Sequence, residues 1–299
     1  MVVAANIPDI DAISWLGGGA SYVHYHRNIT HSLVALPLMA LLAVAIVRCF
    51  AREPIRWLNA WLVALVAVAS HLILDMTNIY GVRLLLPFSG RWFQWDSTPV
   101  IDITILAIIL TGVAAPALTR LVGSEIGMRN KEAGKAGWAI TALLLLAAWD
   151  YGRSIMHDRA VAIMRSNTYS GLSPRRVAAF PTQNPLQWTG AAELSNAFVE
   201  APVDLRSAFH PADEETFIKP PRTPAVEAAL KTFPFARLLE FVQWPLWVVE
   251  PGRVTLVDLR FGSPRSSLFA ASATFDERGR LIDSQFGINP GRSSSGEQR

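Results

Sequence analysis

The chain has 299 residues, of which 51% are hydrophobic and only 17% are charged, whereas about a quarter of the residues in an ordinary soluble protein are charged. Its formal net charge of +3 is too small to indicate a nucleic-acid-binding protein, and its single cysteine, Cys49, excludes an internal disulfide framework. The composition therefore indicates a membrane protein.

The N-terminal region carries the first candidate metal ligands. Asp9 and Asp11 follow Pro8, which predicts an extended or turn segment with both carboxylates accessible, although such a pair is also typical of a helix cap. His26 and His31 stand five residues apart across the expected start of the first long apolar helix. Imidazole and carboxylate groups are costly at the edge of a hydrocarbon phase unless they are paired or bound to an ion. Their position therefore favours a metal site.

Four segments are apolar and long enough to be transmembrane helices, which need about 20 residues to cross the hydrocarbon core. Tryptophans near their ends are typical of the membrane interface. We place the spans at residues 32–50, 57–74, 100–121 and 137–151. The sequence therefore predicts an all-α membrane bundle of about four transmembrane helices over residues 1–152.

The second span ends in a further pair of candidate ligands. His71 and Asp75 are spaced i,i+4, so a helix places them on one face about one turn apart. Each has a simpler alternative when taken alone, which is a hydrogen bond between helices for His71 and a cap for Asp75. Asp102 is a further carboxylate, at the start of the third span, and its alternative is an ion pair with Arg83 or Arg91.

The distribution of lysine and arginine predicts the orientation of these spans. Basic residues are concentrated in the first and third loops and are sparse in the longer second loop, so the first and third loops should be cytoplasmic. The N-terminus, residues 76–99 and the C-terminal domain should then be periplasmic, with all the candidate ligands at one membrane face. The basic residues are Arg48, Arg52 and Arg56 in the first loop, Arg83 and Arg91 in the second, and Arg120, Arg129, Lys131 and Lys135 in the third.

Residues 153–289 have the mixed composition of an extramembrane domain. Alternating and turn-bounded segments predict antiparallel strands, and two further segments predict short helices. The strands are expected at 177–180, 186–188, 193–198, 244–250, 253–260, 268–275 and 281–286, and the helices at 224–232 and 235–242. We therefore expect a small α+β domain with an antiparallel sheet, followed by a disordered tail at residues 290–299.

The candidate ligands are better explained as one metal centre than as isolated side chains. Imidazole and carboxylate donors suit zinc, with manganese or iron as alternatives, and the absence of clustered cysteines disfavours a thiolate site. We expect one or two divalent ions. We interpret His24 as an interfacial residue or one that supports the ligands, and His157 and His210 as surface or packing residues. The expected ligands are Asp9, Asp11, His26, His31, His71 and Asp75.

An ordered series of motifs resembles the bacterial inner-membrane metal-dependent hydrolase family, some of whose members are regulated by LexA. The motifs are Pro8-Asp9-Ile10-Asp11, His26-Arg27 with Thr30-His31-Ser32, Ser70-His71 with Asp75, and Gly81-Val82-Arg83 with Leu86-Pro87-Phe88-Ser89. The resemblance covers about residues 7–150 and implies a multi-spanning membrane protein with a hydrolase site built from these His and Asp residues. Members usually carry an apolar helix before the first motif, where this chain has only Val2-Val3-Ala4-Ala5.

These observations predict a membrane-bound metal-dependent hydrolase at the outer face of the bacterial inner membrane. Metal-activated water would attack an ester, phosphoester or amide of a lipid-borne substrate, so the expected partners are membrane lipids and no nucleic acid. Asp102 is the candidate general base, and Arg27 and Arg83 are expected to stabilise developing negative charge. The alternative is a non-catalytic membrane protein with a structural metal site or an assembly role.

Overall fold

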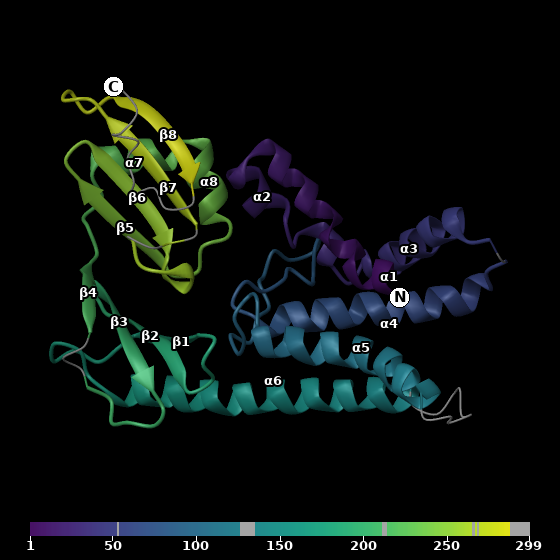
Figure 1. Ribbon diagram of the computed structural model, residues 1–299. Helices are drawn as coiled ribbons and strands as arrows, with labels where there is room; N and C mark the ends of the chain where they lie inside the picture. The colour runs from purple at the N-terminus through teal and green to yellow at the C-terminus, as the bar shows by residue number, and fades with distance from the viewer. Residues whose placement is uncertain (53, 126–134, 211–213, 265–266, 268, 288–299) are drawn as a thin grey trace, which may run out of the picture.

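The chain forms a group of long helices at one end and two antiparallel sheets at the other (Figure 1). The computed structural model describes residues 1–52, 54–125, 135–210, 214–264, 267 and 269–287. The expected tail at residues 290–299 and the loop residues Arg129 and Lys131 lie outside this description.

The N-terminal region consists of short helices that connect the two ends of the molecule. The segment expected to be extended around Asp9 is instead a 3-10 helix, with the proline near its N-terminus, where no backbone donor is needed. The elements are α1 (Val2–Asn6), the 3-10 helix η1 (Ile7–Gly17), α2 (Gly19–Tyr25) and the 3-10 turn η2 (Ile29–His31).

Four long helices follow in the chain, and each overlaps one of the expected spans. They are α3 (Leu36–Phe50), α4 (Trp57–Thr77), α5 (Ile103–Glu125) and α6 (Lys135–Ser166). Within the described residues, α4 and α5 are long and apolar enough to cross a membrane, and α3 adds a third candidate if it is counted together with residues 19–31, from which it is bent by 92°. The structure thus has two or three candidate membrane helices. The expected fourth span forms the first half of α6, which is not among them.

Small residues allow these helices to pack closely. A buried cluster joins α1 and the start of η1 to α3 and α4 through Ala4, Ala43 and Ala64. Gly112 of α5 faces Ala142 of α6 so closely that an added Cβ would lie 2.7 Å from the Ala142 Cβ atom. Such contacts between small side chains are typical of helices packed within a membrane.

The expected antiparallel sheet is present, but the C-terminal half contains two four-stranded sheets rather than one, ordered β1-β2-β3-β4 and β5-β6-β7-β8. The first differs from expectation because its third strand lies later than predicted and its fourth was not predicted. The strands are β1 (Arg176–Pro181), β2 (Gln187–Glu193), β3 (Ala197–Asp204), β4 (Glu215–Ile218), β5 (Pro245–Glu250), β6 (Arg253–Asp258), β7 (Ala270–Phe275) and β8 (Leu281–Gly287).

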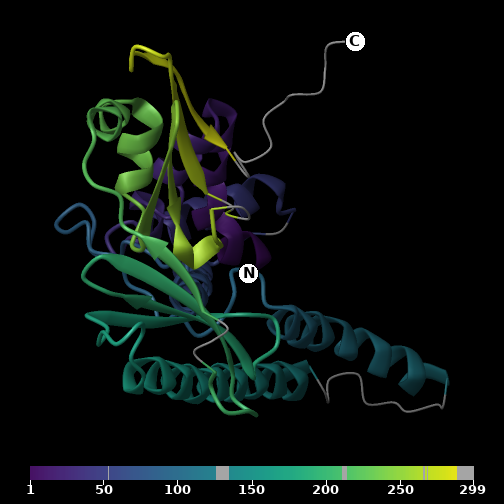
Figure 2. The same ribbon diagram turned by 90° about the vertical axis from the view of Figure 1, so that its left-hand side faces the viewer.

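Both sheets pack against the N-terminal half. The first sheet lies on the end of α6, where Trp188 packs with Ala160 and Met164 (Figure 2). Between the sheets the chain forms α7 (Pro224–Leu230) and α8 (Phe233–Leu239). The core under the second sheet includes Tyr80 together with side chains of α8, and α8 lies beside α2 (Figure 1). The loop that follows α4 is therefore part of the core of the C-terminal domain.

Candidate metal centre

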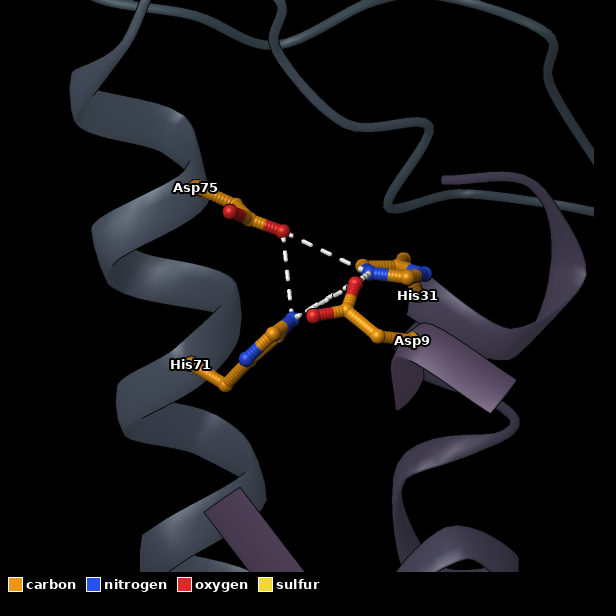
Figure 3. Close-up of side chains that lie close together, drawn as sticks. All are labelled: Asp9, His31, His71 and Asp75. Carbon is orange, nitrogen blue, oxygen red and sulfur yellow. Dashed lines mark hydrogen bonds and ion pairs between the residues drawn. The ribbon is translucent and has the colours of Figure 1, made fainter. Parts of the chain in front are cut away.

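Side chains from three separate segments converge at the end of α4 that is nearest the sheets. Asp9 comes from η1, His31 from η2, and His71 and Asp75 from α4. Each of them offers one ligand atom, and these atoms all lie within 4.8 Å of one another (Figure 3). The structure therefore unites four of the six expected ligands in one cluster.

The distances within this cluster fit the edges of a coordination tetrahedron. Ligand atoms at about 2.0–2.1 Å from a tetrahedral zinc ion lie about 3.3 Å apart. His71 Nε2 lies 3.3 Å from both His31 Nε2 and Asp75 Oδ2, and His31 Nε2 lies 3.4 Å from both Asp75 Oδ2 and Asp9 Oδ1. The contact between His71 Nε2 and Asp9 Oδ1 is 3.6 Å. The donor set and its spacing thus fit a divalent metal ion.

Burial distinguishes three of the ligands from the fourth. The His31 side chain is 0% exposed, and those of His71 and Asp75 are 13% and 11% exposed, whereas that of Asp9 is 42% exposed. Asp75 Oδ2 is buried and accepts no hydrogen bond, which is costly for a carboxylate oxygen without a cation. The cluster therefore has a buried side formed by three donors and an accessible side at Asp9.

Asp11, expected as a ligand, lies behind the cluster and holds the loop that carries His31. Its Oδ2 accepts hydrogen bonds from Arg27 N at 3.0 Å and Thr30 Oγ1 at 2.5 Å, and it lies 3.2 Å from His31 Nδ1. Its Oδ1 lies 2.8 Å from His26 Nδ1. A carboxylate on the outer nitrogen of a histidine ligand fixes the orientation and tautomer of the ring.

A second, smaller group of donors adjoins the first. Asp9, Asp11 and His26 also offer ligand atoms within 4.8 Å of one another. Asp9 belongs to both groups, which is the position of a carboxylate that bridges two metal ions. The expectation of one or two ions therefore corresponds to one compact group and one adjoining group.

The two acidic residues of η1 are held in their charged forms. Burial raises the pKa of Asp11, but hydrogen bonds with His26 and His31 outweigh this effect and lower it to about 2. Burial also raises the pKa of Asp9, and its contacts with His31 and His71 outweigh that and hold it well below its usual range. Both carboxylates are therefore ionised at neutral pH, as metal coordination requires.

Arg27 lies at the cluster, as predicted, but it contacts a ligand carboxylate. Its Nη2 lies 2.8 Å from Asp75 Oδ1, while its Nη1 donates to Asn78 Oδ1 at 2.9 Å. The guanidinium also covers the Tyr80 ring at 4.8 Å. Arg27 therefore fixes Asp75 so that its other oxygen faces the histidines. Asn78 was not predicted from the sequence, although its position directly after the end of α4 was an available signal.

The other two expected catalytic residues lie elsewhere. Asp102 begins α5, where its Oδ1 accepts hydrogen bonds from the backbone of Thr104 and Ile105, and its Oδ2 accepts one from Trp149 Nε1. Arg83 donates to the carbonyl oxygen of Glu240 and covers the Trp92 ring. Neither side chain belongs to the cluster, because Asp102 faces α6 and Arg83 faces the residue after α8.

The three other histidines are outside the metal centre. His24 Nδ1 lies 2.6 Å from Glu240 Oε2, which links α2 to the residue after α8. The His157 ring packs against Trp188, and His210 is exposed. These positions agree with packing or surface roles.

Comparison with known proteins supports a location in the membrane. The sequence profile of the family described as YdjM inner membrane protein matches residues 1–156, slightly more than half of the chain. The chain belongs to the YdjM inner membrane protein family. The matched region contains α1 to α5, most of α6 and the whole metal centre. The family is thus shown to be one of inner membrane proteins, and the hydrolase activity implied by the resemblance is not part of its description.

Two relatives extend this comparison. The chain is 26% identical over 277 residues to the uncharacterized protein YfhP of Bacillus subtilis (strain 168), a match that covers 90% of this chain and 79% of YfhP. It is 37% identical over 95 residues to the inner membrane protein YbcI of Escherichia coli (strain K12), covering 31% of this chain and 54% of YbcI. No solved structure matches the chain.

Proposed function

We propose that this family member is a membrane-bound metal-dependent hydrolase that binds a divalent ion through His31, His71, Asp75 and Asp9. The observation that supports the proposal is a set of five ligand-to-ligand distances of 3.3–3.6 Å among these side chains. Zinc suits two imidazoles and two carboxylates at this spacing, and manganese or iron could use the same donors. The group of Asp9, Asp11 and His26 is the place for a second ion.

The roles of the residues follow from their burial and contacts. A bound divalent ion would lower the pKa of a water molecule toward neutrality and polarise the scissile bond. Asp9 is the most exposed donor, so it is placed to accept a proton from that water or to yield its position to substrate. Arg27 holds Asp75 in place, and its buried Nε has no hydrogen-bond partner among the described residues.

The location of the site supports a substrate that resides in the membrane. His71 and Asp75 occupy the last two turns of a candidate membrane helix, so the metal centre lies at the level of the bilayer surface. The loop charges place that surface on the periplasmic side of a multi-pass inner membrane protein, together with the C-terminal domain. We therefore propose an ester, phosphoester or amide of a lipid as substrate, with membrane lipids as the partners.

A structural metal site is the second candidate. Four protein ligands complete a tetrahedron, which is typical of structural zinc, whereas catalytic zinc keeps one position for water or substrate. The high exposure of Asp9 favours catalysis, since this ligand alone is accessible at the surface. The two candidates therefore differ in whether Asp9 is needed to retain the ion.

Metal analysis of the detergent-purified protein tests the proposal. The wild type should contain at least one divalent ion per chain, and His71→Ala and Asp75→Ala should lose it, while His210→Ala, which removes an exposed histidine outside the cluster, should retain it. Equal metal content in all four proteins would refute the site. Assays of lipid esters, phosphoesters and amides with and without chelator then separate a hydrolase from a structural metal protein.

The orientation is tested separately with reporter fusions. A fusion after residue 52 should report the cytoplasm, and a fusion at the C-terminus should report the periplasm. A cytoplasmic C-terminus would overturn the proposed topology.

A further inference from the structure

The helix η1 has a regular division of its side chains into three columns. A 3-10 helix has about three residues per turn, so side chains at i and i+3 are eclipsed and form straight columns. One column contains Pro8, Asp11 and Ser14, which are buried or half-buried. The second contains Asp9 and ends in Trp15, which is 51% exposed. The columns of η1 therefore differ in how exposed their side chains are.

The third column is apolar and increasingly exposed. It begins at Ile7, which is only 7% exposed because it packs against α3 and α4. Exposure then rises to 49% at Ile10, 69% at Ile13 and 86% at Leu16. Large aliphatic side chains thus leave the core between the candidate membrane helices and continue along the outer face of η1, where no part of the described chain covers them.

The segment that carries this column has few charged residues. Residues 1–26 include no lysine or arginine, and their only acids, Asp9 and Asp11, are committed to the metal centre. Trp15, on the neighbouring column, packs edge-on against Tyr22 at 5.1 Å between ring centroids. Tryptophan and tyrosine are typical of the layer in which hydrocarbon meets lipid head groups.

Exposed apolar side chains also occur beside the candidate membrane helices that η1 contacts, which are α3 and α4. Just before α3, Leu33 and Val34 are 53% and 48% exposed. Exposed aliphatic side chains are therefore found both on η1 and at the start of a candidate span next to it.

We propose that η1 lies within the bilayer surface, with Ile10, Ile13 and Leu16 in contact with acyl chains, so that the metal centre opens toward the membrane. The inferred contact between η1 and lipid is argued from exposure and charge alone. The inferred approach of substrate along η1 rests on the proposed function. Asp9 is the accessible ligand and directly precedes Ile10. A lipid whose chains lie along the apolar column would bring its head group to Asp9.

Site-directed spin labelling of the full-length protein in liposomes tests this proposal. The native cysteine is first removed by Cys49→Ser, and single cysteines are introduced as Leu16→Cys, Val66→Cys and Glu277→Cys. Val66 is 67% exposed in the middle of α4 and reports lipid, while Glu277 is exposed in the turn between β7 and β8 and reports water. Collision rates with oxygen, which concentrates in lipid, and with a water-soluble nickel chelate give a ratio for each label.

The label at Leu16 should give an oxygen-to-nickel ratio closer to that at Val66, at least several-fold above that at Glu277. A ratio closer to that at Glu277 would overturn the proposal. Leu16 is 86% exposed, so its replacement removes no packing, and unchanged metal content in the labelled protein verifies that the centre is intact. If the wild type held no metal while the Leu16 label reported lipid, the proposed function would fail and the lipid contact would stand.

Discussion

Arg260 Nη1 donates a hydrogen bond of 2.8 Å to the carbonyl oxygen of Ile79, a residue 181 positions away. Arg260 is almost fully buried, pairs with Asp258 at 2.7 Å and donates to the carbonyl oxygen of Phe241 at 3.0 Å. Ile79 directly follows Asn78, the acceptor for Arg27. The C-terminal domain thus holds the turn that orients Arg27 and, through it, Asp75.

We expect Arg260→Lys to weaken metal binding by about tenfold, because lysine keeps the charge beside Asp258 but loses the planar set of donors that reaches Ile79. Isothermal titration of the metal-free protein measures the affinity. Arg280→Lys is the matched control, since its ion pair with Asp276 is exposed at the far turn of the same sheet. Unchanged affinity in a folded Arg260→Lys protein would contradict the coupling.

The variant Asp9→Asn should distinguish a catalytic metal site from a structural one. If the three buried donors hold the ion, the variant retains most of its metal and loses at least about 100-fold in hydrolysis, because the accessible carboxylate no longer accepts a proton. Metal content and turnover are measured on the same preparation. Loss of the ion together with a lower melting temperature would instead favour the structural role.

Asp11→Asn should reduce metal affinity without abolishing it. The amide keeps the shape of the side chain but removes the negative charge beside His31 Nδ1, and loss of such an outer carboxylate typically costs about 10- to 100-fold. The comparison is with Asp75→Asn, which alters a direct ligand and should lose the ion altogether. Equal losses in the two variants would assign Asp11 to the ligands rather than to the residues behind them.

Asp96 should make stability depend on pH. Burial raises its pKa from 3.8 to about 6, only partly offset by the positive charge of Arg260 and a hydrogen bond from Gln94. Below about pH 3 the group is largely protonated in both folded and unfolded chains, so it has little effect on stability. As the pH rises toward 6 the unfolded chain ionises first, and the folded state loses stability.

Asp96→Asn should therefore stabilise the protein by about 3 kcal/mol at pH 7.5 and leave it nearly unchanged at about pH 3. The positive φ of 52° at this position suits asparagine as well as aspartate. Unfolding of the metal-free protein across this pH range measures the difference. A constant difference between the two proteins at all pH values would show that Asp96 does not titrate as described.

Spacing in the sequence predicted the part of the site that depends on local geometry. His71 and Asp75 lie on one face of α4 because i,i+4 residues share a helix face, and the concentration of ligands near residues 9–31 placed Asp9 and His31 beside them. The sequence could not separate Asp11 from the four residues of the compact cluster, because that difference depends on which side of η1 faces His31 and His71.

The errors concern contacts made across long separations in the chain. Asp102 and Arg83 stand at apolar borders like the residues of the candidate metal centre, but their partners are Trp149 and Glu240, on or beside helices later in the chain. The role of Arg260 could not be predicted either, because its partner Ile79 lies 181 positions away in the chain. The two hairpins from β5 to β8 were predictable from turns within a few residues, whereas the late position of β3 was not.

Side chains in η1 repeat every three residues, so the number of residues in this segment should be more tightly constrained than their identity. One inserted residue would rotate every following side chain by about 120° about the helix axis, which would bring the position of Asp11 out of its place behind His31 and turn an aliphatic side chain toward the ligands. Among related chains, exchanges of one aliphatic residue for another should be common at positions 10, 13 and 16, while insertions and deletions between Pro8 and Trp15 should be absent.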